Sequence, residues 1–139
     1  MDNKNKMIVK FPSYSKNEAF ARSVAGIFTL QLNPSVAQLS DVKTAVSEAV
    51  TNCIAHGYPE GIGEITMEAE IEDNVLHINV FDDGVGIEDV SEAIEPFFTT
   101  REDEERSGMG FTIMKSFMDE VEVVSAKGKG TKIYMTKNI

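Results

Sequence analysis

Two stretches in the first half of the chain carry apolar residues at the spacing of a helix face. The first predicted helix opens at Ser15-Lys16-Asn17-Glu18, which has the form of a capping box, and ends at Asn33-Pro34. Its predicted apolar stripe consists of Phe20, Val24, Ile27 and Phe28, with Gln31 at the margin. We therefore expect an amphipathic helix that packs by this stripe.

The second predicted helix begins between Ser35 and Ser40 and runs to Gly57, where glycine can take the left-handed conformation that ends a helix. Apolar residues recur every three or four positions along it. They are Val42, Val46, Ala49, Val50 and Cys53. This regular recurrence indicates that one face of the helix packs against a sheet.

Runs rich in β-branched and aromatic residues predict the strands. They are Met7–Phe11, Ile62–Ile71, Val75–Phe81, Glu120–Ala126 and Thr131–Thr136. Pro12 closes the first of them, and the segments 72–74 and 127–130 read as hairpin turns. Helices gathered early and hairpins gathered late favour a two-layer α/β sandwich with a mixed, mostly antiparallel sheet.

The segment between the third and fourth predicted strands is less regular. Ile87–Ile94 reads as a short, weak helix, and Pro96–Ser107 reads as a mobile loop with four consecutive acidic residues at 102–105. Phe111–Met118 is predicted to be helical and to open directly after Gly108-Met109-Gly110. The pattern therefore places an acidic loop immediately before a glycine-rich helix start.

Length and composition limit what the protein can be. The 139 residues carry no linker or repeat and predict a single domain, 1–139, and a net charge of −10 argues against nucleic-acid binding. That charge suits a basic partner, or simply an acidic surface that keeps the protein soluble. A single cysteine excludes an internal disulfide, and neither a membrane-length apolar run nor a secretory signal is present. We expect a cytoplasmic protein that does not bind a membrane.

Glu48 and Asn52 are the first candidates for chemistry. They are four residues apart, so they lie one above the other on the second predicted helix. A carboxylate and an amide placed in this way can offer oxygen ligands to Mg²⁺, and the carboxylate can accept a proton during phosphoryl transfer. Taken alone, the pair is more typical of an exposed helix surface.

Asp82-Asp83-Gly84-Val85-Gly86 follows a predicted strand. A carboxylate at a strand end can accept a hydrogen bond from an adenine amino group, and Gly84 and Gly86 let the backbone approach a flat ring. The same residues also suit a tight turn, because Asp-Gly favours turns wherever it occurs. The two readings are equally compatible with this segment.

Gly108 and Gly110 mark a predicted helix start, whose free backbone N–H groups suit phosphate oxygens. Thr99, Thr100 and two arginines, Arg101 and Arg106, lie in the acidic loop before it. Either arginine can stabilise charge on a phosphoryl group during transfer, although arginines with no function on the protein surface would give the same sequence pattern. Thr131 follows the last hairpin turn, where its hydroxyl can reach a base edge or can simply begin a strand.

Other scaffolds for nucleotide and metal chemistry are absent from the sequence. There is no Walker-type P-loop and no His-Arg-Asp catalytic loop. The two histidines and one cysteine have no zinc-ligand spacing. Nucleotide chemistry in this chain therefore requires a different scaffold.

In their order along the chain, these clusters resemble the nucleotide site of the GHKL (Bergerat-fold) superfamily, with a Glu/Asn box, an Asp-x-Gly-x-Gly box, a lid, a Gly-x-Gly box and a terminal Gly-Thr. The small size and the stretches 46–58, 96–100 and 105–114 resemble the bacterial anti-sigma-factor serine kinases, and most closely those that act in sporulation. The resemblance covers about residues 11–136. It implies a mostly antiparallel sheet with helices on one face and an ATP lid at about 96–108.

The resemblance also implies roles for individual residues. Glu48 would be the general base and Asn52 the ligand of Mg²⁺, while Asp82 would read adenine beside Gly84 and Gly86. The remaining positions would be phosphate contacts at Gly108 and Gly110, lid residues Thr99, Thr100 and Arg106, the adenine contact Thr131, and a partner contact at Arg22. Lysines at 127 and 129 depart from the acidic or neutral residues more usual in relatives.

The implied function is ATP-dependent inhibition of an RNA polymerase sigma factor of the sporulation sigma-F type. The implied reaction is phosphorylation of a serine on an anti-anti-sigma factor by a homodimer. Physically, the strand Met7–Phe11 would offer an unpaired sheet edge for such a dimer. Alternatives are a general-stress anti-sigma kinase, a sigma-binding module without phosphoryl transfer, and the detached ATP-binding domain of a histidine kinase. The last is disfavoured because neither His56 nor His77 lies on a helical hairpin.

Overall fold

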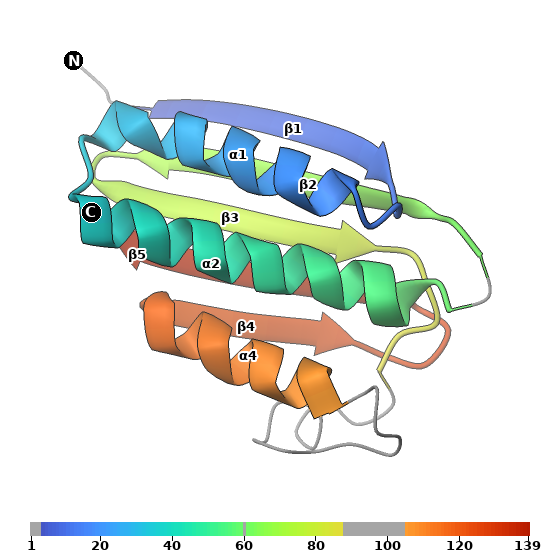
Figure 1. Cartoon of the computed structure of the whole chain (residues 1–139). Coiled ribbons are helices and arrows are strands. Elements are labelled where there is room, and N and C mark those ends of the chain that lie inside the picture. The colour runs from blue at the N-terminus through green and yellow to red at the C-terminus, as the bar shows by residue number, and fades with distance from the viewer. Residues whose placement is uncertain (1–3, 60, 88–104) are drawn as a thin grey trace.

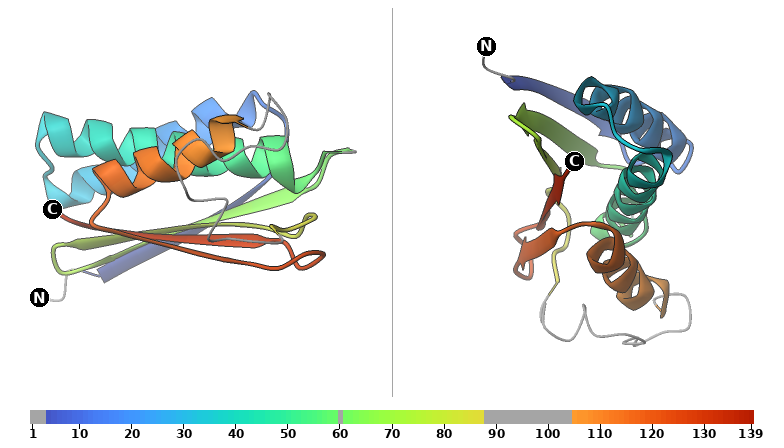
Figure 2. Two further views of the ribbon diagram at one scale, coloured as in Figure 1. Left: turned by 90° about the horizontal axis from the view of Figure 1, so that it is seen from below. Right: turned by 90° about the vertical axis from the view of Figure 1, so that its left-hand side faces the viewer.

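The computed structural model describes residues 4–59, 61–87 and 105–139, and for 105–109 it describes the backbone only. Within these described residues, three α-helices cover one face of a five-stranded sheet (Figures 1 and 2). The helices are α1 (Asn17–Thr29), α2 (Val36–Asn52) and α4 (Glu105–Phe117). The strands are β1 (Lys4–Pro12), β2 (Glu64–Glu72), β3 (Val75–Asp82), β4 (Glu120–Ser125) and β5 (Thr131–Asn138). The predicted two-layer sandwich is confirmed.

The strand order across the sheet is β1-β2-β3-β5-β4. The sheet was expected to be mostly antiparallel, and every pair of described strands is antiparallel. The register sets Ile65 and Thr131 on either side of Asp82 at the end of β3. Strand β1 lies at one edge of the sheet, as predicted.

Helix α2 lies over the middle of the sheet and carries the predicted apolar stripe. All five stripe residues, from Val42 to Cys53, have no exposed surface. Ser35 begins the helix with a capping box, because its hydroxyl accepts from the Gln38 N–H while the Gln38 side chain accepts from the Ser35 N–H. The helix ends in one π-helical stretch, η2 (Cys53–Gly57).

The predicted stripe of α1 is only half right. Phe28 is buried and Val24 packs against the core, whereas Phe20 is 50% exposed and Ile27 is 68% exposed. The rest of the buried face consists of small residues, and Ala21 and Ala25 have no exposed surface. Small side chains on this face let α1 pack closely beside α2. Short side chains such as alanine add little to a hydrophobic pattern. The larger residues therefore dominated the pattern and shifted the predicted buried face.

The predicted capping box at Ser15 is also wrong. Lys16 occupies the N-cap position of α1 without a side-chain hydrogen bond. The carboxylate of Glu18 instead accepts a hydrogen bond from the Ser47 hydroxyl of α2 and lies 3.6 Å from the Arg22 guanidinium. Glu18 therefore joins two helices rather than capping one, which its local sequence could not show.

Helix α4 begins at Glu105, earlier than predicted. Gly108-Met109-Gly110 therefore lies inside the helix and does not precede it. The predicted helix at 87–94 and the predicted loop up to residue 104 lie outside the described residues, apart from Ile87. Within the described part of the chain, no helix is long and apolar enough to span a membrane.

Candidate functional site

Four segments that are distant in sequence meet at one end of the molecule. They are the carboxyl end of α2, the carboxyl end of β3, the amino end of α4 and the β4–β5 hairpin (Figure 1). Each contains one of the polar or glycine-rich clusters identified in the sequence. The fold thus gathers the described parts of all the clusters at one place.

Glycines hold three of these segments at backbone contact distance. A β-carbon built on Gly84 would lie 1.8 Å from the carbonyl oxygen of Gly57, and one on Gly86 would lie 2.0 Å from that of Ala126. A β-carbon on Gly130 would lie 2.1 Å from the carbonyl oxygen of Asp82. No side chain fits at these distances, so the close packing requires glycine.

Asp82 is the most buried carboxylate of the site, with 4% of its surface exposed. Its Oδ1 accepts a hydrogen bond from the Gly84 N–H at 2.8 Å. Burial raises the pKa of Asp82, and the bond from Gly84 opposes that rise. In the part of the chain that the structure describes, no cation offsets the burial of this carboxylate.

Thr131 belongs to a second hydrogen-bond group beside Asp82. Its hydroxyl lies 2.9 Å from the Ser125 hydroxyl, which donates to the Gly130 carbonyl at 2.7 Å and accepts from the Ile87 N–H at 2.7 Å. Ser125 thus ties the β4–β5 hairpin to the chain that leaves β3. Both Thr131 and Gly130 are buried as a result.

Glu48 and Asn52 lie on α2 one turn apart, as predicted. Asn52 is 6% exposed and Glu48 is half-buried. A β-carbon on Gly110 of α4 would approach Glu48 Oε2 to 3.2 Å, so this glycine lies directly against the carboxylate. Glu48 therefore faces α4, and Asn52 is buried one turn farther along α2.

Other predicted site residues lie farther from this centre or outside the described chain. Arg22 lies on α1 and lines a groove of about 590 Å³ between α1 and α2. Arg106 and Gly108 fall in the first turn of α4, whose backbone N–H groups lack helical partners. Thr99 and Thr100 lie outside the described residues.

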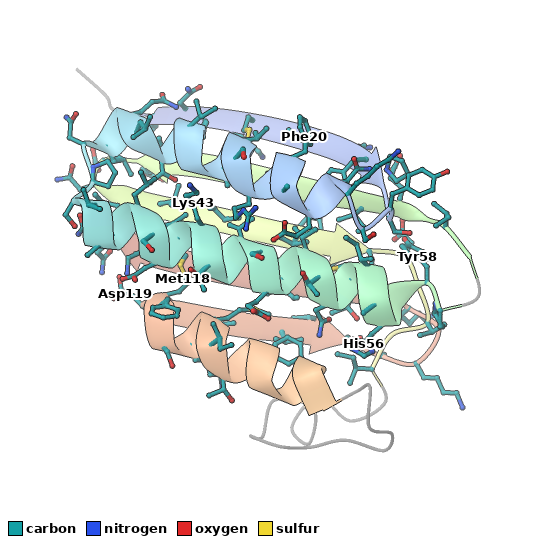
Figure 3. The ribbon with its side chains drawn as sticks, viewed as in Figure 1. Phe20, Lys43, His56, Tyr58, Met118 and Asp119 are labelled. Atoms are coloured by element: carbon teal, nitrogen blue, oxygen red, sulfur yellow. The ribbon has the colours of Figure 1, made fainter. Side chains whose placement is uncertain are left out.

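Three further residues shape the site and were not singled out from the sequence. Gly57 was interpreted only as a helix end, but a β-carbon there would lie 2.9 Å from Asp82 Oδ2. The Tyr58 hydroxyl accepts from the Asp83 N–H and donates to the Glu64 carbonyl, near the end of α2 (Figure 3). Ser125 had no sequence signal, because an isolated serine in a strand is common.

The side chains that could act as metal ligands limit which metal this site can hold. Among the described residues there is no cluster of three or more histidine, cysteine, aspartate or glutamate side chains of the kind that binds a metal alone. Mg²⁺ is commonly held by one or two protein oxygens together with substrate phosphates. A buried amide at Asn52 fits that mode and does not fit an all-protein metal cage.

The chain belongs to the histidine kinase-like ATPase domains, whose family model matches residues 14–137. Within that class, the chain is 57% identical to the anti-sigma F factor of Caldanaerobacter subterraneus subsp. tengcongensis, over 100% of this chain and 97% of the relative. It is 55% identical to that of Clostridium acetobutylicum, over 96% and 93%. The chain belongs to the anti-sigma F factor family.

Solved structures support the fold independently of sequence. The RsbU and RsbW domains of a Mycobacterium tuberculosis protein superpose with a TM-score of 0.69 at 16% identity, covering 96% of this chain and 32% of that one. The histidine kinase domain of a blue-light-activated kinase from Erythrobacter litoralis gives 0.60 at 18% identity, covering 87% and 60%. These likenesses show the shared fold.

Proposed function

We propose that this protein is an ATP-dependent anti-sigma factor that also phosphorylates a serine of an anti-anti-sigma factor. The main support is the convergence of Glu48, Asn52, Asp82 and Thr131 on one glycine-lined end of the sheet. The names of its relatives supply the sigma factor as the inhibited partner. We assign sporulation transcription as the process by the same likeness.

Adenine would bind at the Asp82 side of the site. The carboxylate accepts from the exocyclic amino group, and Gly84 and Gly86 keep the backbone clear of the ring. Thr131 lies beside Asp82 through the strand register and completes the base contacts with its hydroxyl. An amino group also complements a carboxylate that has no cation among its described partners.

The phosphates would extend toward α2 and α4. Asn52 would hold Mg²⁺, and that ion would neutralise charge on the phosphate oxygens. Gly108 and Gly110, with the first turn of α4, contact the phosphates, and Thr99, Thr100 and Arg106 act from the lid. Glu48 accepts the proton of the acceptor serine as its oxygen attacks the γ-phosphorus and ADP leaves.

Two protein surfaces belong to the same proposal. Arg22 contacts a partner from the groove between α1 and α2, which Lys43 also lines. Strand β1 is an edge strand, and its unpaired side offers backbone groups to a second copy in a homodimer. Light scattering in the presence of ATP measures that dimer directly, and a monomer at micromolar concentration would remove it from the proposal.

The decisive experiment compares Glu48→Gln with wild type in a transfer assay with ATP, Mg²⁺ and a purified anti-anti-sigma factor. We expect transfer to fall at least about 100-fold, because the general base is lost. ATP affinity should stay close to wild type, since Glu48 contacts the acceptor side. Glu70→Gln, on the sheet face away from the helices, is the matched control and should transfer normally.

Transfer by Glu48→Gln at the wild-type rate would show that Glu48 is not the base. A wild-type protein that binds the sigma factor with ATP but never phosphorylates the acceptor would instead support a binding module without phosphoryl transfer. Binding to the sigma factor is therefore measured on the same preparations.

A further inference from the structure

Three polar side chains form one row across the sheet at its glycine-lined end. The strand register places Thr131 of β5 between Ser125 of β4 and Asp82 of β3. Asp82 and Thr131 are each 4% exposed, so the row lies on the face that the helices cover. Residues directly opposite each other on antiparallel strands have β-carbons about 5 Å apart. The Thr131 side chain therefore stands between those of Ser125 and Asp82.

The hydrogen bonds of Ser125 determine which way the Thr131 hydroxyl donates. A serine hydroxyl has one proton to donate and two lone pairs that accept. The Ile87 N–H, 2.7 Å from the Ser125 oxygen, can only donate, so Ser125 accepts from it. The Gly130 carbonyl, also 2.7 Å away, can only accept, so it takes the single Ser125 proton. At the 2.9 Å contact between the two hydroxyls, Thr131 is therefore the donor.

This direction leaves the Thr131 hydroxyl with no proton for a ligand. Its one O–H bond points at Ser125, and only lone pairs remain on its oxygen. The neighbouring Asp82 carboxylate, when ionised, also has only lone pairs to offer. Two adjacent acceptors suit a ligand group that carries more than one N–H bond, and an exocyclic amino group is such a group.

We propose that Ser125 is a positioning residue for base selection, because it holds the Thr131 hydroxyl as an acceptor beside Asp82. The inference rests on the proposed nucleotide function. Adenine carries an amino group at the position where hypoxanthine carries a carbonyl oxygen. Two fixed acceptors attract that amino group and repel that oxygen. Without the Ser125 hydroxyl, Thr131 can turn its proton toward the ligand and donate to the oxygen, so Asp82 alone separates the two bases.

The experiment measures the affinities of the full chain for ADP and for inosine 5′-diphosphate, each with Mg²⁺, by calorimetry. Ser125→Ala removes the acceptor for the Thr131 proton, and Ser125→Thr keeps it. Ser116→Ala is the matched control, because it removes a hydroxyl that donates to the Thr112 carbonyl at 2.9 Å near the carboxyl end of α4. If Ser125→Ala does not fold, Ser125→Cys provides the same comparison, since a thiol is only a weak acceptor.

We expect the ratio of the ADP affinity to the inosine 5′-diphosphate affinity to fall about tenfold in Ser125→Ala, because Thr131 then donates to the hypoxanthine oxygen. Ser125→Thr and Ser116→Ala should keep the wild-type ratio. A purely structural role for Ser125, which also ties the β4–β5 hairpin to Ile87, predicts equal weakening of both nucleotides. An unchanged ratio in Ser125→Ala would therefore overturn the inference while leaving the proposed function intact.

A double substitution tests whether Ser125 acts through Thr131. Thr131→Val removes the hydroxyl that Ser125 orients and keeps the branched shape of the side chain. In the Thr131→Val background, Ser125→Ala should leave the affinity ratio unchanged, because the group through which it acts is gone. The same tenfold fall in both backgrounds would overturn the inference. A wild-type protein that does not bind ADP would overturn the proposed function and the inference together.

Discussion

The two ends of the sheet each bury one charged side chain, and they do so in different ways. At the carboxyl end of β3, Asp82 accepts from the neutral Gly84 N–H and has no cation among its described partners. At the opposite end, Lys137 of β5 is 9% exposed, and its ammonium donates to the Phe117 carbonyl at 2.6 Å and lies 3.6 Å from Asp41. One charge is paired, and the other is not.

This difference distinguishes Lys137, a charge that stabilises the fold, from Asp82, a charge that is available to a ligand. Lys137 joins β5 to α2 and to the carboxyl end of α4, where its charge also complements the helix dipole. Asp119, which lies beside that helix end (Figure 3), adds a hydrogen bond from the Asn138 N–H at 2.6 Å. The Asp82 end keeps an acceptor whose burial is incompletely compensated, which is what a ligand-binding group requires.

The glycine end should be the less tolerant of the two, and Gly130→Ala tests this most strongly. The new β-carbon would lie 2.1 Å from the Asp82 carbonyl oxygen, on a backbone with φ of 75°. We expect a loss of about 3 kcal/mol or more from strain and overpacking, together with loss of ADP binding. Urea unfolding and calorimetry measure the two effects.

Gly128→Ala is the control for this substitution. Its φ of 77° imposes the same backbone strain, but a β-carbon there meets no atom within 4 Å. It should cost only about 1 kcal/mol and leave ADP binding unchanged. Equal losses in the two variants would show that backbone conformation, and not close packing around Asp82, makes glycine necessary at position 130.

At the paired end, Lys137→Met should reduce stability and leave nucleotide binding alone. It leaves the Phe117 carbonyl and Asp41 without their cation, for an expected loss of about 1–2 kcal/mol in urea unfolding. Lys132→Met, on the exposed face of the same strand, should stay within about 0.5 kcal/mol of wild type. A large drop in ADP affinity for Lys137→Met would mean that the two ends are coupled.

The sequence predicted the paired end poorly and the glycine end well, for physical reasons. Asp82, Gly84, Gly86 and Thr131 lie in compact local clusters, so their proximity to one another required only the correct strand order. Lys137 and Asp41 are 96 positions apart (137 − 41) and have no local signature. A charge that is buried by tertiary packing alone cannot be read from neighbouring residues.

The helices show the same limit. The stripe of α2 was predicted correctly because three buried valines mark it, whereas α1 also buries alanines that a hydrophobic pattern underweights. The start of α4 was misplaced because glycine normally opposes helix interiors. A β-carbon at Gly110 would crowd Glu48 Oε2, which belongs to another helix.

Gly110→Ala tests separately the preference of a helix for alanine over glycine and the space that Glu48 needs beside α4. Replacing a helical glycine should stabilise α4 by up to about 1 kcal/mol, yet the new β-carbon would lie 3.2 Å from Glu48 Oε2 and displace the carboxylate. We expect unchanged or higher stability with phosphoryl transfer reduced about tenfold. Gly26→Ala in α1 is matched to it, since its β-carbon meets the Lys43 stem at the same 3.2 Å, and it should leave transfer unchanged. Equal transfer rates in both variants would exclude a role for the Gly110–Glu48 contact.

The smallest expected effect is the contribution of Asp82 to the pH dependence of stability. Burial raises its pKa in the folded, nucleotide-free protein, so the folded state binds the proton more readily than the unfolded state. Relative to Asp82→Asn, the unfolding free energy of wild type should therefore fall as the pH rises from about 4 through the raised pKa. Parallel plots of unfolding free energy against pH for wild type and Asp82→Asn would show that hydrogen bonding to Asp82 compensates fully for its burial. Asp82 and Lys137 would then not differ in how well their burial is compensated.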